Sequence, residues 1–221
     1  ELNVIDMIEV VTTGNAVDFG DLTIGRTANG MGSSSTRGLF AAGRFPGANN
    51  DQSQIDYITT SSGGGANDFG DLTIGRTANG MGCSSTRGLF AAGRYPGANN
   101  DQNQIDYITT SSGGGANDFG NLSNLPCSST GFSDATRAIF AGGYDARTSP
   151  YLRTRAMTYV TIATTGDSSN FGETVEPGRR DTSFSNATKG FTCGVSTPSA
   201  SKRIEMSIIQ TKGSTIDFGE L

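Results

Sequence analysis

The stretch IDYITTSSGGGANDFG occurs twice without a change, at residues 55–70 and again at residues 105–120. Looser copies of it begin at Ile5, Met157 and Ile204. A second motif, TANGMGSSSTRGLFAAGRFPGANNDQSQ, starts at Thr27, returns from Thr77 with three exchanges, and decays to ATRAIFAGGYD at 135–145 and ATKGFTCGV at 187–195. Self-similarity with a period of about 50 residues marks an array of units that must stack on one another to bury their faces.

Each period predicts four short strands, which in the first complete copy lie around residues 27–34, 37–43, 54–61 and 69–75. The third stretch alternates β-branched and aromatic residues with polar ones, as a half-buried strand does. The second is rich in Ala and Gly, which suits a place where neighbouring sheets crowd together. The Gly run at 63–65 supplies a turn. The sequence therefore predicts an all-β fold of four-stranded units.

The order of these features resembles the kelch repeat. The resemblance rests on Arg26 and Ala28, on RGLFAAG at 37–43, on IDYIT at 55–59, and on IFAGGYD at 139–145 with its Gly doublet. The chain departs from the kelch pattern by having no Trp, and Phe takes the place of the closing Trp in each unit. These phenylalanines are Phe69, Phe119, Phe171 and Phe218. The resemblance implies a kelch-like β-propeller with blades of four strands.

We expect a single repeat array over residues 1–221, with about four complete blades and a two-strand remnant. The predicted boundaries are a half blade at 1–22 and blades at 23–72, 73–122, 123–174 and 175–221. Closed propellers have four to eight blades and remove open edges by completing the ring. Three alternatives stay open for the remnant: a small ring shared by both terminal strands, a fragment of a longer array, or completion by another subunit.

Composition excludes several classes of function. A net charge of −5 and no basic run argue against nucleic-acid binding, and no apolar stretch approaches the length of a membrane span. The chain has no His, which removes the commonest general base and metal ligand. Cys83, Cys127 and Cys193 lack CxxC spacing and are expected to be packed thiols. We expect no enzyme activity, no cofactor and no metal.

Carboxylates recur at fixed positions of the repeat, which favours a structural role in turns or blade contacts. They are Asp18, Asp68, Asp118, Asp56 and Asp106. Recurring cations at Arg37, Arg87, Arg137 and Lys189 suggest a belt of ion pairs with them. A glycosidase, which needs two carboxylates facing each other across a sugar, is the less favoured alternative.

The loop between the second and third strands is the candidate ligand-binding surface. In each of two successive repeats this loop contains an Arg, a flat aromatic ring, amides and an acid. Such repetition suits multivalent recognition of a sugar or an aromatic partner. The candidate residues are Arg44, Phe45, Asn49, Asn50, Asp51, Arg94, Tyr95, Asn99, Asn100 and Asp101. A long turn rich in Pro, Gly and Asn is the simpler interpretation. The spacing of the acids does not match a calcium-binding loop.

The amino-acid sequence of the repeat is similar to that of kelch-like repeat proteins of tailed bacteriophages, notably marine ones. In those proteins such arrays are associated with tails or fibres. This resemblance implies a structural and recognition module in a virion appendage, located in the virion or outside the cell. We expect its partners to be host-surface glycans or other proteins of an assembly, with a homo-oligomer as one option. The alternative is a secreted carbohydrate-binding lectin.

Overall fold

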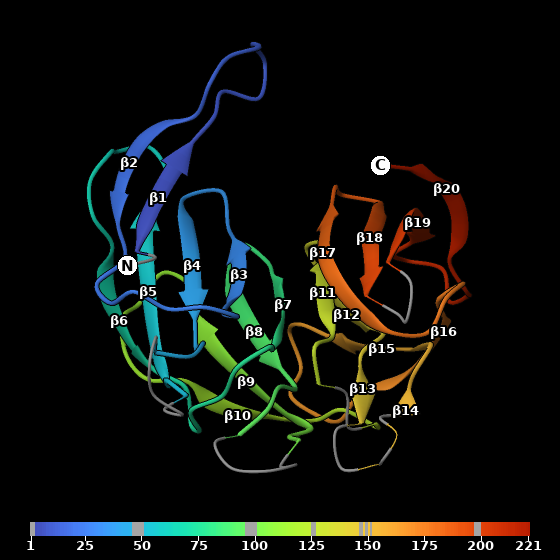
Figure 1. The fold of residues 1–221 in the computed structure, drawn as a ribbon. Helices are drawn as coiled ribbons and strands as arrows, with labels where there is room; N and C mark the ends of the chain where they lie inside the picture. The colour runs from blue at the N-terminus through green and yellow to red at the C-terminus, as the bar shows by residue number, and fades with distance from the viewer. Residues whose placement is uncertain are drawn as a thin grey trace.

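The computed structural model describes residues 3–45, 51–95, 101–124, 127–145, 148, 150, 152–196 and 200–221, apart from the side chains of 180 and 181. Four four-stranded antiparallel sheets are arranged in a ring like a four-bladed propeller, and smaller two-stranded sheets accompany them (Figure 1). The predicted all-β propeller architecture is therefore confirmed. None of the described residues forms a helix that could cross a membrane.

Each blade is a run of strands paired in chain order, except that a small hairpin is inserted in the third. The first blade holds β3 (Gly30–Ser33), β4 (Arg37–Ala41), β5 (Gln54–Thr59) and β6 (Asn67–Asp71). The second holds β7 (Gly80–Cys83), β8 (Arg87–Ala91), β9 (Gln104–Thr109) and β10 (Asn117–Asn121). The third holds β11 (Thr130–Ser133), β12 (Arg137–Ala141), β15 (Ala156–Thr161) and β16 (Ser169–Glu173). The fourth holds β17 (Arg179–Ser185), β18 (Lys189–Ser196), β19 (Ser201–Ile208) and β20 (Ile216–Glu220).

Two pairs of strands stand outside these blades. The half blade is β1 (Val4–Met7) paired with β2 (Val17–Asp21), and the inserted hairpin is β13 (Tyr144–Asp145) with β14 (Leu152–Arg153). In Figure 1 the sheets follow chain order around an arc, from the half blade at upper left to the fourth blade at upper right. The half blade is therefore the first unit of the series, and the fourth blade is the last.

The first strand of every blade is the innermost. Strands β3, β7, β11 and β17 together line a cavity of about 320 Å³ at the centre of the ring. The small residues of the second strand, such as Ala41 and Ala42, have no exposed surface, as expected where sheets crowd together. The observed first strand, Gly30–Ser33, is shorter than the predicted strand at 27–34, because Thr27 forms an isolated bridge with Arg44 instead of joining β3.

The apolar core lies between neighbouring blades. We call the sheet face turned toward the next blade in chain order the forward face, and the opposite one the backward face. Leu39, Ile55 and Phe69 on the forward face of the first blade pack with Phe90 and Ile108 on the backward face of the second. The same positions fill two further clusters. These contain Leu89, Ile105, Phe119, Phe140 and Val160, and then Ile139, Met157, Phe171 and Ile209.

A glycine on the fourth strand of the half blade and of each of the first three blades touches the turn of the next blade. A Cβ on Gly70 would lie 2.6 Å from the carbonyl carbon of Gly114. In addition, the Gly114 N–H donates to the Phe69 carbonyl at 2.7 Å. Equivalent hydrogen bonds run from Gly64 to Phe19, from Gly166 to Phe119 and from Gly213 to Phe171. Because the backbones meet directly, a side chain at this glycine has no space.

An arginine at the start of the second strand ties each blade to the next. The Arg37 guanidinium stacks 4.4 Å from the centre of the Tyr57 ring and donates from Nη1 to the Thr110 carbonyl at 2.7 Å. Arg87 and Arg137 repeat both contacts one and two blades later. Among the described residues, none of these three arginines forms the predicted ion pair with a repeated carboxylate, because each donates to a carbonyl oxygen and stacks on an aromatic face instead.

Replacing Gly70 with alanine tests the contact between blades, and Gly219→Ala is its matched control. Both glycines have positive φ, at 132° and 155°, but a Cβ on Gly219 would meet nothing within 4 Å. We expect Gly70→Ala to reduce the free energy of unfolding by about 2 kcal/mol more than Gly219→Ala, because only the former overpacks a neighbour. Urea denaturation measures the difference. Equal losses would mean that the contact contributes nothing beyond backbone strain.

Candidate functional site

The candidate ligand loops are fastened at their bases by the backbone. In the first blade, Thr27 and Arg44 exchange two backbone hydrogen bonds of 3.0 and 2.8 Å, and Arg44 also bridges to Asp51. The chain turns sharply just before this point, where Ala42 and Gly43 have φ values of 63° and 103°. A Cβ on Gly43 would lie 2.8 Å from the Thr27 carbonyl oxygen. The second blade repeats this arrangement with Thr77, Arg94 and Asp101.

The acid of each loop serves as an internal anchor. Arg44 donates from Nε to Oδ1 of Asp51 at 2.9 Å, and the Asp51 side chain has no exposed surface although the Arg44 side chain is 41% exposed. Asp101 is buried at the equivalent position, where it bridges to Arg94. Because a carboxylate that is buried and paired offers little to a ligand, Asp51 holds Arg44 in place while the Arg44 side chain faces solvent.

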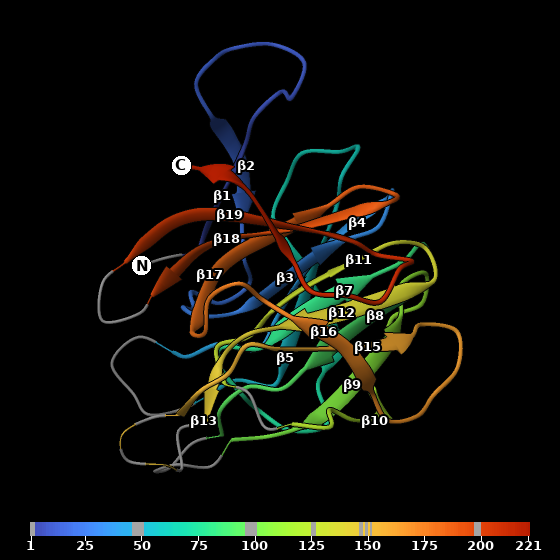
Figure 2. The same cartoon turned by 90° about the vertical axis from the view of Figure 1, so that its right-hand side faces the viewer.

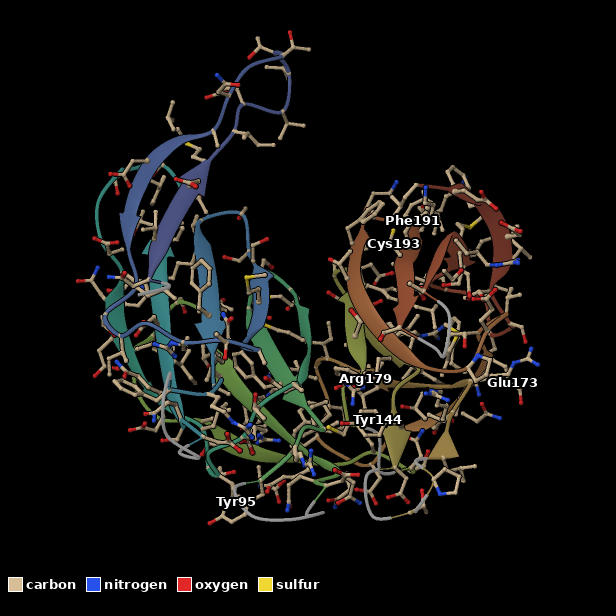
Figure 3. All side chains as sticks on the ribbon, viewed as in Figure 1. Tyr95, Tyr144, Glu173, Arg179, Phe191 and Cys193 are labelled. Carbon is tan, nitrogen blue, oxygen red and sulfur yellow. The ribbon has the colours of Figure 1, made fainter. Side chains whose placement is uncertain are left out.

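The two aromatic residues are the most accessible of the predicted contacts that the structure describes. Phe45 is 43% exposed and Tyr95 is 39% exposed, and each follows its anchored arginine directly. Figure 3 shows Tyr95 at the lower edge of the molecule. We call Arg44 with Phe45, and Arg94 with Tyr95, the arginine–aromatic pairs. The other predicted contacts, Asn49, Asn50, Asn99 and Asn100, lie outside the described residues.

The third blade builds a different structure at the same place. Tyr144 occupies the position of Arg44, is buried, and bridges to Cys127. The Arg179 guanidinium stacks 4.4 Å from the centre of its ring, as the two labelled side chains in Figure 3 illustrate. Sequence reasoning missed this contact, because the two residues lie far apart in the chain and neither belongs to an intact copy of the motif.

A pocket of about 790 Å³ lies beside the second loop and was not predicted from the sequence. It is formed where Asn103 and Asn124 of the second blade's flanking segments meet β14 and the edge of the third blade. Arg155 and Glu173 line it as a partly exposed ion pair with 3.7 Å between Nε and Oε2. Leu152, which is 66% exposed, adds an apolar patch. The lining combines amides, opposite charges and one apolar side, which suits a polar ligand of mixed character.

The repeated acids of the third strand are structural. Asp56 is fully buried and accepts from Nη2 of Arg26 at 2.5 Å and from the Thr23 hydroxyl at 2.7 Å. Asp106 repeats this with Arg76 and Thr73. Burial lowers the pKa of the Arg76 guanidinium, and the charge of Asp106 opposes that shift.

The acids before the FG pair also have a local structural role. Asp68 and Asp118 each accept from the backbone N–H two residues later, at 2.9 and 3.1 Å. These bonds lie at the bulge of the fourth strand in the first and second blades. The structural interpretation of the repeated carboxylates is therefore confirmed at Asp56, Asp106, Asp68 and Asp118. No group of three or more metal-ligating side chains occurs within the described ranges.

The three cysteines are free thiols. Burial raises the pKa of Cys83 to about 12 and also raises the pKa values of Cys127 and Cys193. Since only a thiolate is a good nucleophile, the raised pKa values disfavour reaction at these thiols.

The central cavity contains a polar residue that the sequence did not point to. Asn79 is 7% exposed, lines the cavity, and both polar atoms of its amide are buried with no hydrogen-bond partner in the described part of the chain. Its side chain packs over Gly30 of the first blade. Buried amides normally pair with a protein group or an ordered water, so a water on the cavity side would complete this one.

No family model matches the chain, and no curated protein matches it in sequence.

Removing one buried acid tests its structural role. Asp106→Ala leaves Arg76 buried without its charge partner, and we expect the free energy of unfolding to fall by about 3–5 kcal/mol. Asp118→Ala, the control, removes an exposed acid with one backbone hydrogen bond and should cost about 1 kcal/mol. Urea denaturation measures both. The double change Arg76→Met with Asp106→Leu should cost less than Asp106→Ala alone, and a larger cost would contradict this explanation.

Proposed function

We propose that this protein is a non-enzymatic recognition module that binds glycans through its arginine–aromatic pairs. The observation that carries the proposal is the repetition of one exposed pair on two successive blades. Phe45 and Tyr95 keep 43% and 39% of their surface exposed. The Arg44 side chain beside Phe45 is held by the buried Asp51, and Arg94 beside Tyr95 is a backbone bridge partner of the buried Asp101. A fixed aromatic ring next to a fixed cation costs little ordering entropy on binding.

The chemistry of the pairs suits a sugar. A flat ring packs against the C–H face of a pyranose, while guanidinium N–H groups donate to hydroxyl oxygens. The neighbouring pocket, with the amides of Asn103 and Asn124, extends this surface toward the third blade. Two sites on one rigid scaffold favour a ligand that presents several sugars, because the second contact is then made at a high effective concentration.

We place this module in a virion appendage, such as a tail or fibre, or on an extracellular surface. The support is the resemblance of the repeat to kelch-like proteins of tailed bacteriophages, together with the near-identity of the first two blades, which adds repeated surface without a unique site. Its partners would then be host-surface glycans or other proteins of the same assembly. Fold alone does not fix function, so binding has to be measured.

A secreted lectin is the second candidate, favoured by the same exposed rings. The two functions differ in what is bound: a lectin has measurable affinity for free sugars, whereas an appendage protein needs a dense cell-surface array. A glycosidase receives no support from the repeated acids, since Asp56 and Asp106 are engaged by Arg26 and Arg76. Glycan release during prolonged incubation would contradict the non-enzymatic assignment.

Alanine variants at the two rings test the proposal. On a glycan array read at several protein concentrations, we expect Phe45→Ala or Tyr95→Ala to weaken binding about thirtyfold, because one damaged site removes avidity, and the double variant to weaken binding further still. Val11→Ala, which truncates an apolar side chain 89% exposed on the half blade, is the matched control and should bind like the unmodified chain. Undiminished binding by the double variant would reject the arginine–aromatic pairs as the site.

A further inference from the structure

The half blade has an unpaired strand edge. In each complete blade the third strand lies between the second and the fourth, as β5 lies between β4 and β6. Strand β1 takes the position of a third strand but pairs only with β2. The edge of β1 that is equivalent to the β4-facing edge of β5 therefore has no strand partner among the described residues. An open edge of this kind is a template for another strand.

An acid on that edge lacks the partner found in its counterparts. Asp6 corresponds to Asp56 and Asp106, which are fully buried against Arg26 and Arg76. Asp6 itself is exposed, and no arginine of the described part of the chain pairs with it. A segment that completes this unit would bring an arginine to Asp6.

The fourth blade exposes a forward face that is buried in the other blades. Phe218 is 58% exposed, while its counterpart Phe119 is 3% exposed. Phe184 is 54% exposed, while its counterpart Phe132 is 3% exposed. The Phe191 ring links them, with centres 4.9 Å from Phe184 and 5.1 Å from Phe218. The result is an aromatic cluster without the covering blade that the earlier positions have.

The half blade exposes the matching backward face. Ile8 is 63% exposed and Val10 is 92% exposed, whereas the corresponding Ile108 and Ile162 are 1% and 2% exposed. The contact between turn and strand is also unmade here. Among the described residues, the Gly14 N–H makes no backbone hydrogen bond like that of its counterpart Gly64 to Phe19. On β20, a Cβ on Gly219 would meet nothing within 4 Å, whereas a Cβ on Gly70 would meet the turn of the next blade. The contact between a fourth-strand glycine and the next turn is made four times within the series. In the described part of the chain, the half blade has the turn without a preceding strand, and the fourth blade has the glycine without a following turn.

What is missing between these two faces is the inner half of one blade. In Figure 1 the half blade and β17–β20 stand on either side of the opening of the arc, and Figure 2 shows the half blade behind the fourth blade when viewed from that side. The half blade already holds a third and a fourth strand. A first and a second strand, preceded by an arginine, would pair with β1 and cover the Phe184 and Phe191 rings.

We propose that the β1 edge and the forward face of the fourth blade form a docking site for a β-hairpin of the chain's own inner-strand type. Its pattern is that of residues 23–43, TIGRTANGMGSSSTRGLFAAG, with the first arginine reaching Asp6. The register follows from the first blade, where Leu39 lies opposite Tyr57 and Ala41 opposite Ile55. The leucine of the hairpin therefore faces Met7, and the ring closes as five blades. This inference rests on the fold and is independent of the proposed glycan binding.

A synthetic peptide of residues 23–43 titrated into the full chain tests the proposal. We expect saturable one-to-one binding by calorimetry, a higher melting temperature, and slower hydrogen exchange at β1 and β20. The peptide with its first arginine replaced by alanine, and the chain variant Asp6→Asn, should each bind about tenfold more weakly. Asp18→Asn, which changes another exposed acid of the half blade, is the control and should bind as the unmodified chain does.

A fusion keeps the test decisive if the free peptide does not fold. Leu221 corresponds to Leu72, so the same 23–43 segment appended after Leu221 enters in the register of the repeat. We expect the fused chain to melt at a higher temperature than the fused chain carrying the arginine-to-alanine change. Equal melting temperatures would overturn the proposal. A concentration-dependent dimer that the peptide does not disperse would also overturn it, since a second copy would then cover these faces.

Discussion

The rest of the structure depends on the direct backbone contact between the fourth strand of one blade and the turn of the next. Gly20, Gly70, Gly120 and Gly172 each lie against such a turn, and an N–H of that turn donates to the preceding Phe carbonyl. With the backbones in contact, the aromatic and aliphatic side chains on either side meet at a fixed distance. The interblade clusters follow from that spacing, because their members come from equivalent positions in successive blades.

The buried Arg26–Asp56 and Arg76–Asp106 pairs act within single blades rather than between them. Each arginine also donates to carbonyls of its own blade, at Gln54 and at Gln104, so the pair fixes the third strand relative to the segment that begins the blade. Burying such a pair contributes little net stability, while leaving one partner alone is costly. Because Asp56 and Asp106 are needed as partners of the buried arginines, they are not free to act on a substrate. Among the described loop residues, the Phe45 and Tyr95 rings and the Arg44 side chain face solvent.

The blade architecture could be predicted from the sequence because each strand leaves a local pattern. The alternation in IDYIT, the small residues after RGLF and the glycine turns are readable within one repeat, and the period supplies the stacking. The partner of Asp56 was not found, because ion pairing depends on which residues meet in space. A signal existed: Arg26 and Asp56 recur together as Arg76 and Asp106 with unchanged spacing.

The candidate site was predictable only in part. The loop composition pointed to Arg44, Phe45 and their copies, but it could not distinguish the exposed ring from the buried Asp51 in the same loop. The pocket beside β14 was not predictable, since it forms where segments of two blades converge. The exposed faces of the two end units could not be predicted from local sequence. Phe218 and Phe119 have the same sequence context, but only Phe119 is covered by a following blade.

Amide hydrogen exchange tests the central claim, that one repeated backbone contact joins the units and is unmade at the half blade. The Gly64, Gly114, Gly166 and Gly213 amides each donate to the fourth strand of the preceding unit, whereas the Gly14 amide makes no such bond among the described residues. We predict that the four amides exchange at least about a hundredfold more slowly than Gly14, as the opening of a stable contact requires. Exchange at Gly114 as fast as at Gly14 would contradict the account.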